Sequence, residues 1–122
     1  MIVREINPIG DSDSASLLIS DGTHECVAFH HPCTLDLASS LTAPLAALDA
    51  ENVVRADTDV ASIRRIDSSA FAHRIIGVVQ SAINGSALVS VGDILIDDIQ
   101  LPGDVAVGEF VEFTVNRLDA FA

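Results

Sequence analysis

The residues best suited to chemistry lie in one short stretch, residues 23–33, which reads THECVAFHHPC. This stretch holds three histidines, a glutamate and both cysteines of the chain. Imidazole nitrogens and cysteine thiolates are the ligands that zinc prefers in tetrahedral protein sites. The candidate metal ligands are therefore His24, Cys26, His30 and Cys33, and zinc is the cofactor that they would hold.

The spacing of these residues weighs against a metal site. On an extended strand alternate residues share a face, so His24, Cys26 and His30 would point the same way. Neighbours on that face lie about 6.5–7 Å apart, and His30 lies about 13 Å along the strand from Cys26. None of the spacings matches the short motifs that wrap a metal ion. We therefore expect a structural role, with Cys26 as a small buried residue, and keep metal binding as the alternative.

Catalysis by this stretch has less support. A reactive cysteine needs a positive environment to favour its thiolate, whereas the formal charges near Cys26 are negative. The sequence has neither a nucleophile-elbow serine motif nor a glycine-rich phosphate loop. Asp97 and Asp98 would point to opposite faces of a regular strand, which does not suit shared acid–base catalysis. We expect one of them to be solvated and the other to lie at a bulge or a strand end. We expect a protein that is not an enzyme and has no catalytic residues.

The charge of the chain limits its partners. The 122 residues include 18 acidic residues, six arginines and no lysine, and the formal net charge is −12. Nucleic-acid binding rests on cations that displace counterions from phosphates, so this composition disfavours it, and it disfavours anionic membranes as well. An acidic surface can instead bind a basic protein. We expect a protein partner or self-association, with Asp97, Asp98, Glu109 and Glu112 as the candidate contacts.

The sequence also predicts a cellular location. The first ten residues, MIVREINPIG, contain two charges and a proline before an apolar run of signal-peptide length can form. The apolar stretches are too short to span a bilayer as a helix. Two cysteines suit free thiols in a reducing compartment better than a disulfide framework. These features favour a cytoplasmic protein.

Aligning the chain with itself reveals a candidate internal repeat. At an offset of 70 positions, residues 1–52 face residues 71–122 without a gap, and ten of the 52 pairs are identical. The matches fall on turn residues and on alternate apolar positions, where a shared backbone would need them. The sequence thus predicts a single domain of residues 1–122, with a repeat and a connector at residues 53–70.

The second copy reads as short strands separated by turns. Its strands are expected at residues 74–80, 87–91, 94–101 and 109–118. Asn84-Gly85 suits a type I′ hairpin turn, and Pro102-Gly103 suits a type II turn with a positive φ at Gly103. The first copy repeats this plan at residues 2–6, 15–20 and 23–30, whereas residues 34–48 could form a short helix or a strand.

Short strands joined by Gly, Pro and Asn turns predict an all-β fold with a minor helical part. We expect a small antiparallel β-barrel or sandwich, built from a pair of four-strand meanders. The stretch LPGDVAVGEFVEFTV, and its counterpart in the first copy, resembles the turn pattern of small bent barrels of the Sm-like, SH3-like and oligonucleotide-binding-fold type.

That resemblance implies nucleic acid as a ligand. Such surfaces use cations and stacking aromatics, whereas this chain has five Phe and no Tyr or Trp. Nucleic-acid binding is therefore the second alternative, after metal binding. The function that we expect first is that of a small acidic β-barrel protein that binds a protein partner, either a basic protein or a second copy of itself.

Overall fold

The structure is a computed structural model that describes residues 1–66 and 71–121. In these residues the fold is all-β, because eleven strands form one sheet and no segment is helical. The expected all-β class is confirmed. The short helix considered for residues 34–48 is wrong, since the regular part of that segment is strand β4 (Leu45–Leu48). No helix in the described residues is long and apolar enough to cross a membrane.

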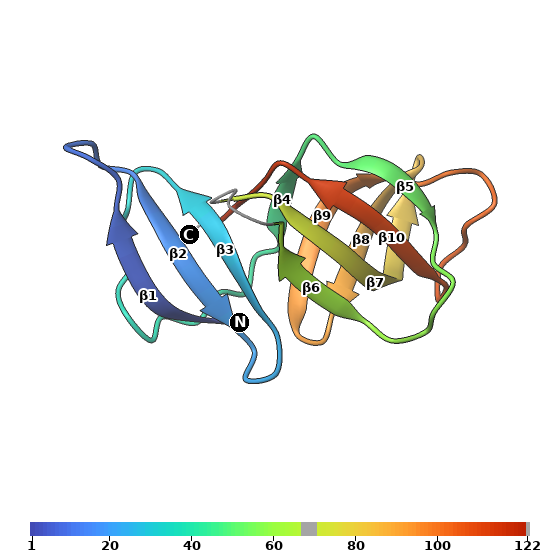
Figure 1. The fold of residues 1–122 in the computed structure, drawn as a ribbon, viewed down its shortest axis with the longest axis horizontal. Coiled ribbons are helices and arrows are strands. Elements are labelled where there is room, and N and C mark those ends of the chain that lie inside the picture. The colour runs from blue at the N-terminus through green and yellow to red at the C-terminus, as the bar shows by residue number, and fades with distance from the viewer. Residues whose placement is uncertain (67–70, 122) are drawn as a thin grey trace.

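The first part of the chain forms an antiparallel meander at one end of the molecule (Figure 1). Its strands are β1 (Ile2–Pro8), β2 (Ala15–Ser20) and β3 (Glu25–His30). Residues 38–41 run along the outer side of β1, where the amide of Val3 donates to the carbonyl of Ser39. This segment gives the meander a short fourth member.

A second antiparallel meander follows later in the chain. It consists of β7 (His73–Ile83), β8 (Ser86–Val91) and β9 (Ile94–Gln100), and β10 (Phe110–Val115) pairs with the other side of β7. The φ angles of Asn84 and Gly85 are 53° and 81°, as a type I′ turn requires.

The expected positive φ at Gly103 is wrong, because Gly103 is not among the residues with a left-handed backbone. The turn there begins one residue later than expected, with the amide of Val105 donating to the carbonyl of Pro102. Gly103 is then the second residue of the turn, a position that takes a negative φ in type I turns.

Four short strands complete the sheet. β4 and β11 (Arg117–Asp119) connect the two meanders, since β11 pairs with β3 and β4, and β4 pairs with β9. β5 (Glu51–Arg55) ends the sheet beside β10, and β6 (Ser62–Arg65) pairs with β7.

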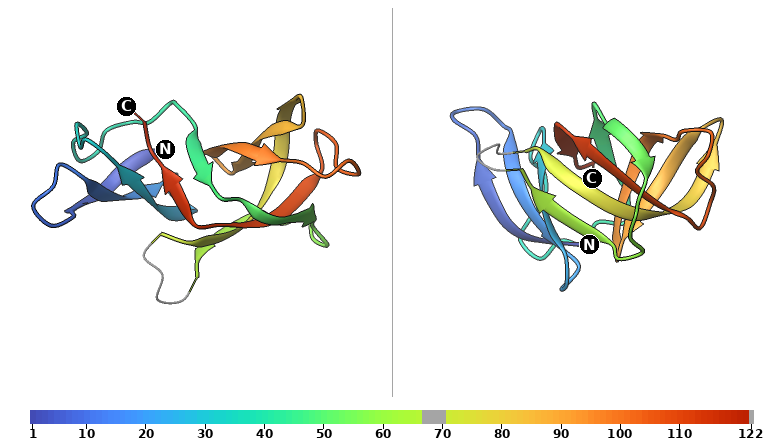
Figure 2. Two further views of the ribbon diagram at one scale, coloured as in Figure 1. Left: turned by 90° about the horizontal axis from the view of Figure 1, so that it is seen from above. Right: turned by 45° about the vertical axis from the view of Figure 1, so that its right-hand side comes forward.

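The sheet curls but does not close into the barrel that the sequence had favoured, so the sandwich-like alternative describes it better. Figure 2 shows the first meander, in blue, extending sideways from the curled strands of the rest of the chain. Beside the first meander, β3 and β6 are neighbours that are not paired in the described residues, which leaves this part of the sheet open.

The two copies of the candidate repeat have the same antiparallel order, β1–β2–β3 and β7–β8–β9. Common ancestry stays a prediction. The connector at residues 53–70 contains the end of β5 and all of β6, and its residues 67–70 lie outside the described part of the chain.

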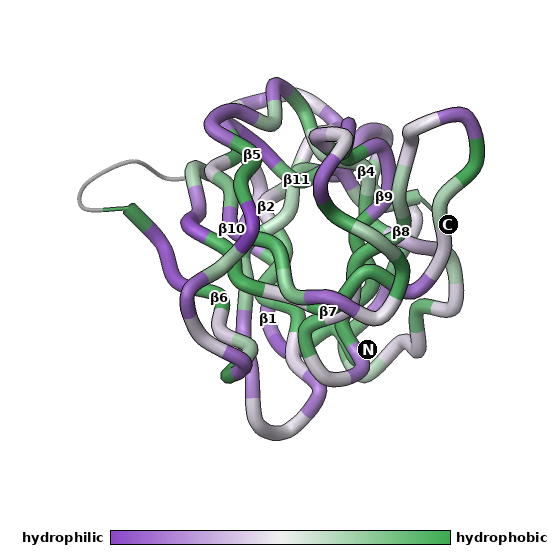
Figure 3. Tube along the Cα trace, turned by 90° about the vertical axis from the view of Figure 1, so that its right-hand side faces the viewer, coloured by the Kyte–Doolittle hydropathy of each residue, from purple (hydrophilic) through white to green (hydrophobic). Residues whose placement is uncertain are grey.

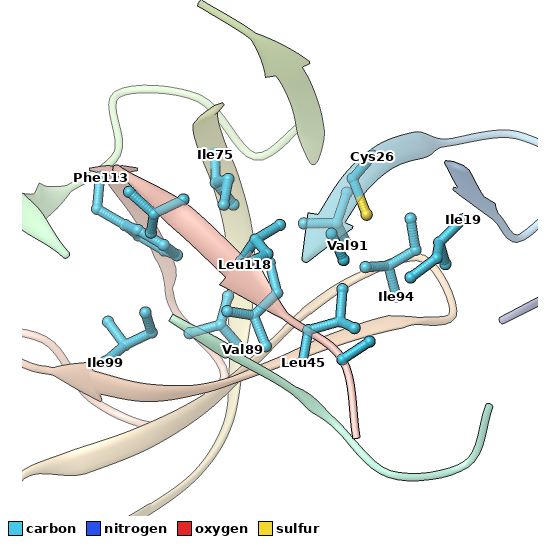
Figure 4. Close-up of a cluster of buried hydrophobic side chains, with 14 of the residues drawn as sticks. Ile19, Cys26, Leu45, Ile75, Val89, Val91, Ile94, Ile99, Phe113 and Leu118 are labelled. Carbon is cyan, nitrogen blue, oxygen red and sulfur yellow. The ribbon is translucent and has the colours of Figure 1, made fainter. Parts of the chain in front are cut away.

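One apolar core joins both meanders. On β10, Val111, Phe113 and Val115 are buried, as the alternating pattern predicted. Figure 3 shows apolar residues along the strands around the centre and polar residues in the loops. Figure 4 shows Ile19 of β2 beside Ile94 of β9, so side chains from both meanders pack together.

Candidate functional site

The structure separates the four candidate metal ligands. Cys26 is 1% exposed and points into the core (Figure 4). His24 lies in the turn before β3, with its Nδ1 3.2 Å from Oδ2 of Asp21. His30 is buried and its Nδ1 lies 2.8 Å from the carbonyl oxygen of Ala120. Cys33 is half-buried beyond the end of β3. Within residues 1–66 and 71–121, no three His, Cys, Asp or Glu side chains are arranged to hold a metal ion.

Cys26 is buried, as the sequence predicted. It is a free, buried thiol, and its counterpart in the second copy, Ile96, is also buried. Burial, together with the nearby charge of Asp21, raises the pKa of Cys26 to about 12. Since the thiolate is the form that attacks substrates and binds metals, the environment of Cys26 opposes both reactions.

Asp21 holds the turn before β3 against the turn before β9. Its Oδ1 accepts hydrogen bonds from the amides of Thr23 (2.8 Å) and His24 (2.6 Å), and its Oδ2 accepts one from the amide of Asp93 (2.9 Å). Burial by itself would raise the pKa of Asp21. The hydrogen bonds from His24, Asp93 and Thr23 outweigh burial and hold that pKa well below its usual range. This carboxylate therefore works as a structural anion that fixes the two turns to each other.

His73 of β7 is a buried polar residue that the sequence reasoning missed. Its Nε2 accepts a hydrogen bond from the amide of Val27 on β3 at 3.1 Å, and its Nδ1 lies 2.9 Å from the carbonyl oxygen of Phe71. An amide can only donate and a carbonyl can only accept, so the ring is neutral with its proton on Nδ1. The sequence did contain an indication that His73 is buried, because the repeat aligns His73 with Val3, which is a core residue.

The imidazole of His73 makes a hydrogen bond between β7 and β3 at this open part of the sheet. Burial lowers the pKa of His73, and the positive charge of Arg65 lowers it further, whereas the hydrogen bond to Phe71 acts in the opposite direction. The folded structure therefore favours the neutral ring, whose Nε2 can accept the amide proton of Val27.

A groove lies along this open part of the sheet, and we call it the β3–β6 groove. Its first part, of about 470 Å³, is lined by residues 23–27 and by β6. Its second part, of about 460 Å³, extends over the outer face of β1 and β2. Leu18, Val27 and Arg65 line both parts. The thiol beside this groove is the high-pKa Cys26, so the groove suits the packing of a ligand or segment better than nucleophilic catalysis.

The four acidic residues proposed as partner contacts fall into two kinds. Glu109 forms an ion pair with Arg55, and Glu112 forms one with Arg74, so the chain itself compensates both charges. Sequence reasoning could not foresee these pairs, because their members are 54 and 38 residues apart.

No ion pair between described residues compensates Asp97 or Asp98 in this way. The φ of Asp98 is 67°, and the pairing register shifts where Ala87 and Val89 face this part of β9. The expectation that one of these aspartates lies at a bulge is confirmed, and both residues are exposed there.

Comparisons with known proteins do not assign the chain to a family. No protein-family model, curated protein or solved structure matches it. Its function therefore has to be argued from its own residues.

Proposed function

We propose that this protein acts by binding a protein partner, either a basic protein or a second copy of itself, and that it does not catalyse a reaction. The observation that carries this proposal is the pair Asp97 and Asp98 on β9. Two adjacent carboxylates are exposed there at one bulge, without a cation from the described residues to compensate them.

The balance of charges supports a basic partner. Three of the six arginines, Arg55, Arg74 and Arg117, pair with acids of the same chain. The chain has 18 acids, so most of its negative charge has no internal partner of this kind. A surface of one sign attracts an oppositely charged protein over a Debye length and accelerates their association.

The cytoplasmic location expected from the sequence is part of this proposal, and it is supported by the two free thiols, Cys26 and Cys33. Zinc binding and nucleic-acid binding stay predictions. The high pKa of Cys26 weakens the first, and the net charge of −12 weakens the second.

A charge-matched comparison tests the role of the two aspartates. The variant D97N/D98N and the control E109Q/E112Q both change the net charge from −12 to −10. Asparagine tolerates the positive φ at position 98, so the bulge is kept. The measurement is the affinity for a synthetic lysine-rich peptide at about 50 mM and about 500 mM NaCl.

We expect D97N/D98N to weaken binding of the peptide about three- to tenfold at low salt, with a smaller loss in the control. High salt should weaken binding by all three proteins. Equal losses in the two variants would show that net charge alone attracts the peptide. Absence of binding at low salt would refute the basic-partner proposal.

A further inference from the structure

The β3–β6 groove has an apolar floor that lies outside the core. Leu18 of β2 and Val27 of β3 lie opposite each other in the pairing register, so their side chains share one face. Val27 is only 9% exposed although it is not part of the core cluster, so other residues of the groove shield it. Ile63 adds an apolar side chain to the first part of the groove, and Phe71 adds one to the second part.

The groove has the size of a small-molecule site. Its two parts, of about 470 and about 460 Å³, each lie within the range of about 300–1,000 Å³ that is usual for such sites. Sites of this kind combine an apolar lining with a few polar groups that fix the orientation of the ligand. The polar group that lies where the two parts meet therefore indicates the chemistry of the ligand.

That polar group is the guanidinium of Arg65, which lines both parts of the groove. Arg65 of β6 lies opposite His73 in the pairing register, so the two side chains share a face, and the charge of Arg65 lowers the pKa of His73. Within residues 1–66 and 71–121 Arg65 forms no ion pair, in contrast to Arg55, Arg74 and Arg117. Its charge is therefore available to an anion from outside the chain.

The planar guanidinium of arginine matches the geometry of a carboxylate, which it can bind through two parallel hydrogen bonds. Arg65 is exposed, and an exposed ion pair is weak by itself. A bound carboxylate must therefore carry an apolar part that buries surface against Leu18 and Val27. A carboxylic acid with an aliphatic or aromatic body satisfies both requirements.

Two acids limit the charge of the ligand. Glu25 lines the first part of the groove and Glu5 lines the second, and both are exposed. Neither forms an ion pair with Arg65 in the described structure. Together with the net charge of −12, these carboxylates repel anions, and the repulsion increases with each negative charge on the ligand. The groove therefore favours a single negative charge over a dicarboxylate or a phosphate ester.

We propose that the β3–β6 groove binds a small amphipathic monocarboxylate, with its carboxylate on Arg65 and its apolar body over Leu18 and Val27. This inference goes beyond the proposed function and does not depend on it. Asp97 and Asp98 are not among the described residues that line the groove, so binding of a basic protein can fail while this inference stands, and the reverse also holds.

The test is a titration of the full chain with octanoate, followed by the amide resonances in NMR spectra. We expect the amides of Leu18 and Val27 and the imidazole of His73 to shift, with a dissociation constant of about 1 mM for a ligand of this size. Acetate, which lacks the apolar body, should bind at least tenfold more weakly, and 1-octanol, which lacks the charge, at least threefold more weakly. Absence of these shifts with octanoate up to about 2 mM would overturn the inference, as would equal affinity for octanoate and 1-octanol.

A pair of arginine variants locates the carboxylate. R65Q and R64Q both change the net charge from −12 to −13, but Arg64 is the neighbouring residue on β6 and does not line the groove. R65Q should raise the dissociation constant for octanoate about three- to fivefold, whereas R64Q should change it by less than about 1.5-fold. Equal effects of the two variants would overturn the assignment of the carboxylate to Arg65.

A pair of acidic variants tests the repulsion in the groove. E5Q/E25Q and D97N/D98N both change the net charge from −12 to −10, but the second pair lies on β9, away from the groove lining. E5Q/E25Q should lower the dissociation constant for octanoate about twofold or more, and D97N/D98N should have a smaller effect. Equal effects of the two double variants would place the bound carboxylate outside the groove and overturn the inference.

Discussion

Replacing His73 with leucine tests how the open part of the sheet is held together. The substitution removes the acceptor for the amide of Val27 and the donor to the carbonyl of Phe71. His73 is fully buried, so leucine fills a similar space without reaching solvent. The variant therefore changes hydrogen bonding at the β3–β6 groove more than it changes packing.

The cost of the substitution follows from these two contacts. A buried amide without a partner costs about 1–3 kcal/mol, and the lost bond to Phe71 adds about 1 kcal/mol. The larger apolar surface that leucine buries offsets about 1 kcal/mol. We expect His73→Leu to lower the free energy of unfolding by about 1–3 kcal/mol at pH 8.

The pH dependence gives a sharper signature. The folded protein lowers the pKa of His73 below the ordinary value of 6.5, so the unfolded chain binds this proton first. The stability associated with the neutral ring is complete above about pH 6.5 and is lost as the pH falls below it. One proton changes the free energy of unfolding by at most about 1.4 kcal/mol per pH unit. The leucine variant lacks this dependence, so its deficit should shrink in acid.

Urea unfolding of wild type and of His73→Leu from pH 8 to pH 5 measures this deficit. Subtracting the two free energies of unfolding at each pH cancels the contributions of the other histidines. His31→Leu is the control, because His31 is exposed and its Nδ1 lies 2.8 Å from the hydroxyl of Ser14. It should cost less than about 1 kcal/mol at pH 8. A deficit of His73→Leu that stays constant from pH 8 to pH 5 would refute the proposed role of the neutral ring.

Two further predictions concern the cysteines and the turn at Asp21. In the native protein a thiol reagent should modify the half-buried Cys33 first and Cys26 only after unfolding, because burial raises the pKa of Cys26 to about 12. Mass spectrometry measures the rate of modification at each cysteine, and equal rates would contradict this prediction. Gly92→Ala should cost about 3 kcal/mol or more in urea unfolding, since its φ is positive and a methyl group would overlap the Asp21 carboxylate. Gly22→Ala has free space around it and should cost only about 1 kcal/mol of backbone strain, so equal costs would show that Asp21 does not limit this turn.

Local patterns in the sequence located most of the strands. Residues 15–20 were expected as a strand and coincide with β2, and the Asn84-Gly85 turn has the predicted backbone conformation. These predictions succeeded because period-two alternation and turn chemistry depend on residues close together in the chain. Burial of Cys26 was predicted on a different ground, because the repeat aligns Cys26 with the apolar residue Ile96.

The candidate contacts were harder to predict, because their environments depend on distant residues. Glu109 and Glu112 were proposed as partner contacts because of their charges, and the sequence does not show what compensates those charges. In the fold, Arg55 and Arg74 form ion pairs with them. For Asp97 and Asp98 the sequence left open whether one of them lies at a bulge or at a strand end, because the bulge depends on a register shift opposite β8. A charge can be read from a sequence, but its partner cannot.

The sequence by itself determined the all-β class, the acidic surface and the positions of the main turns. These follow from composition and from contacts between near neighbours. Only the tertiary structure decided that the sheet stays open, that His73 donates and accepts hydrogen bonds between β7 and its neighbours, including the amide of Val27, and that β5 is the last strand of the sheet in the described residues. Each of these features depends on the curvature accumulated over the whole sheet, which sums small twists from every strand and is specified by no single segment.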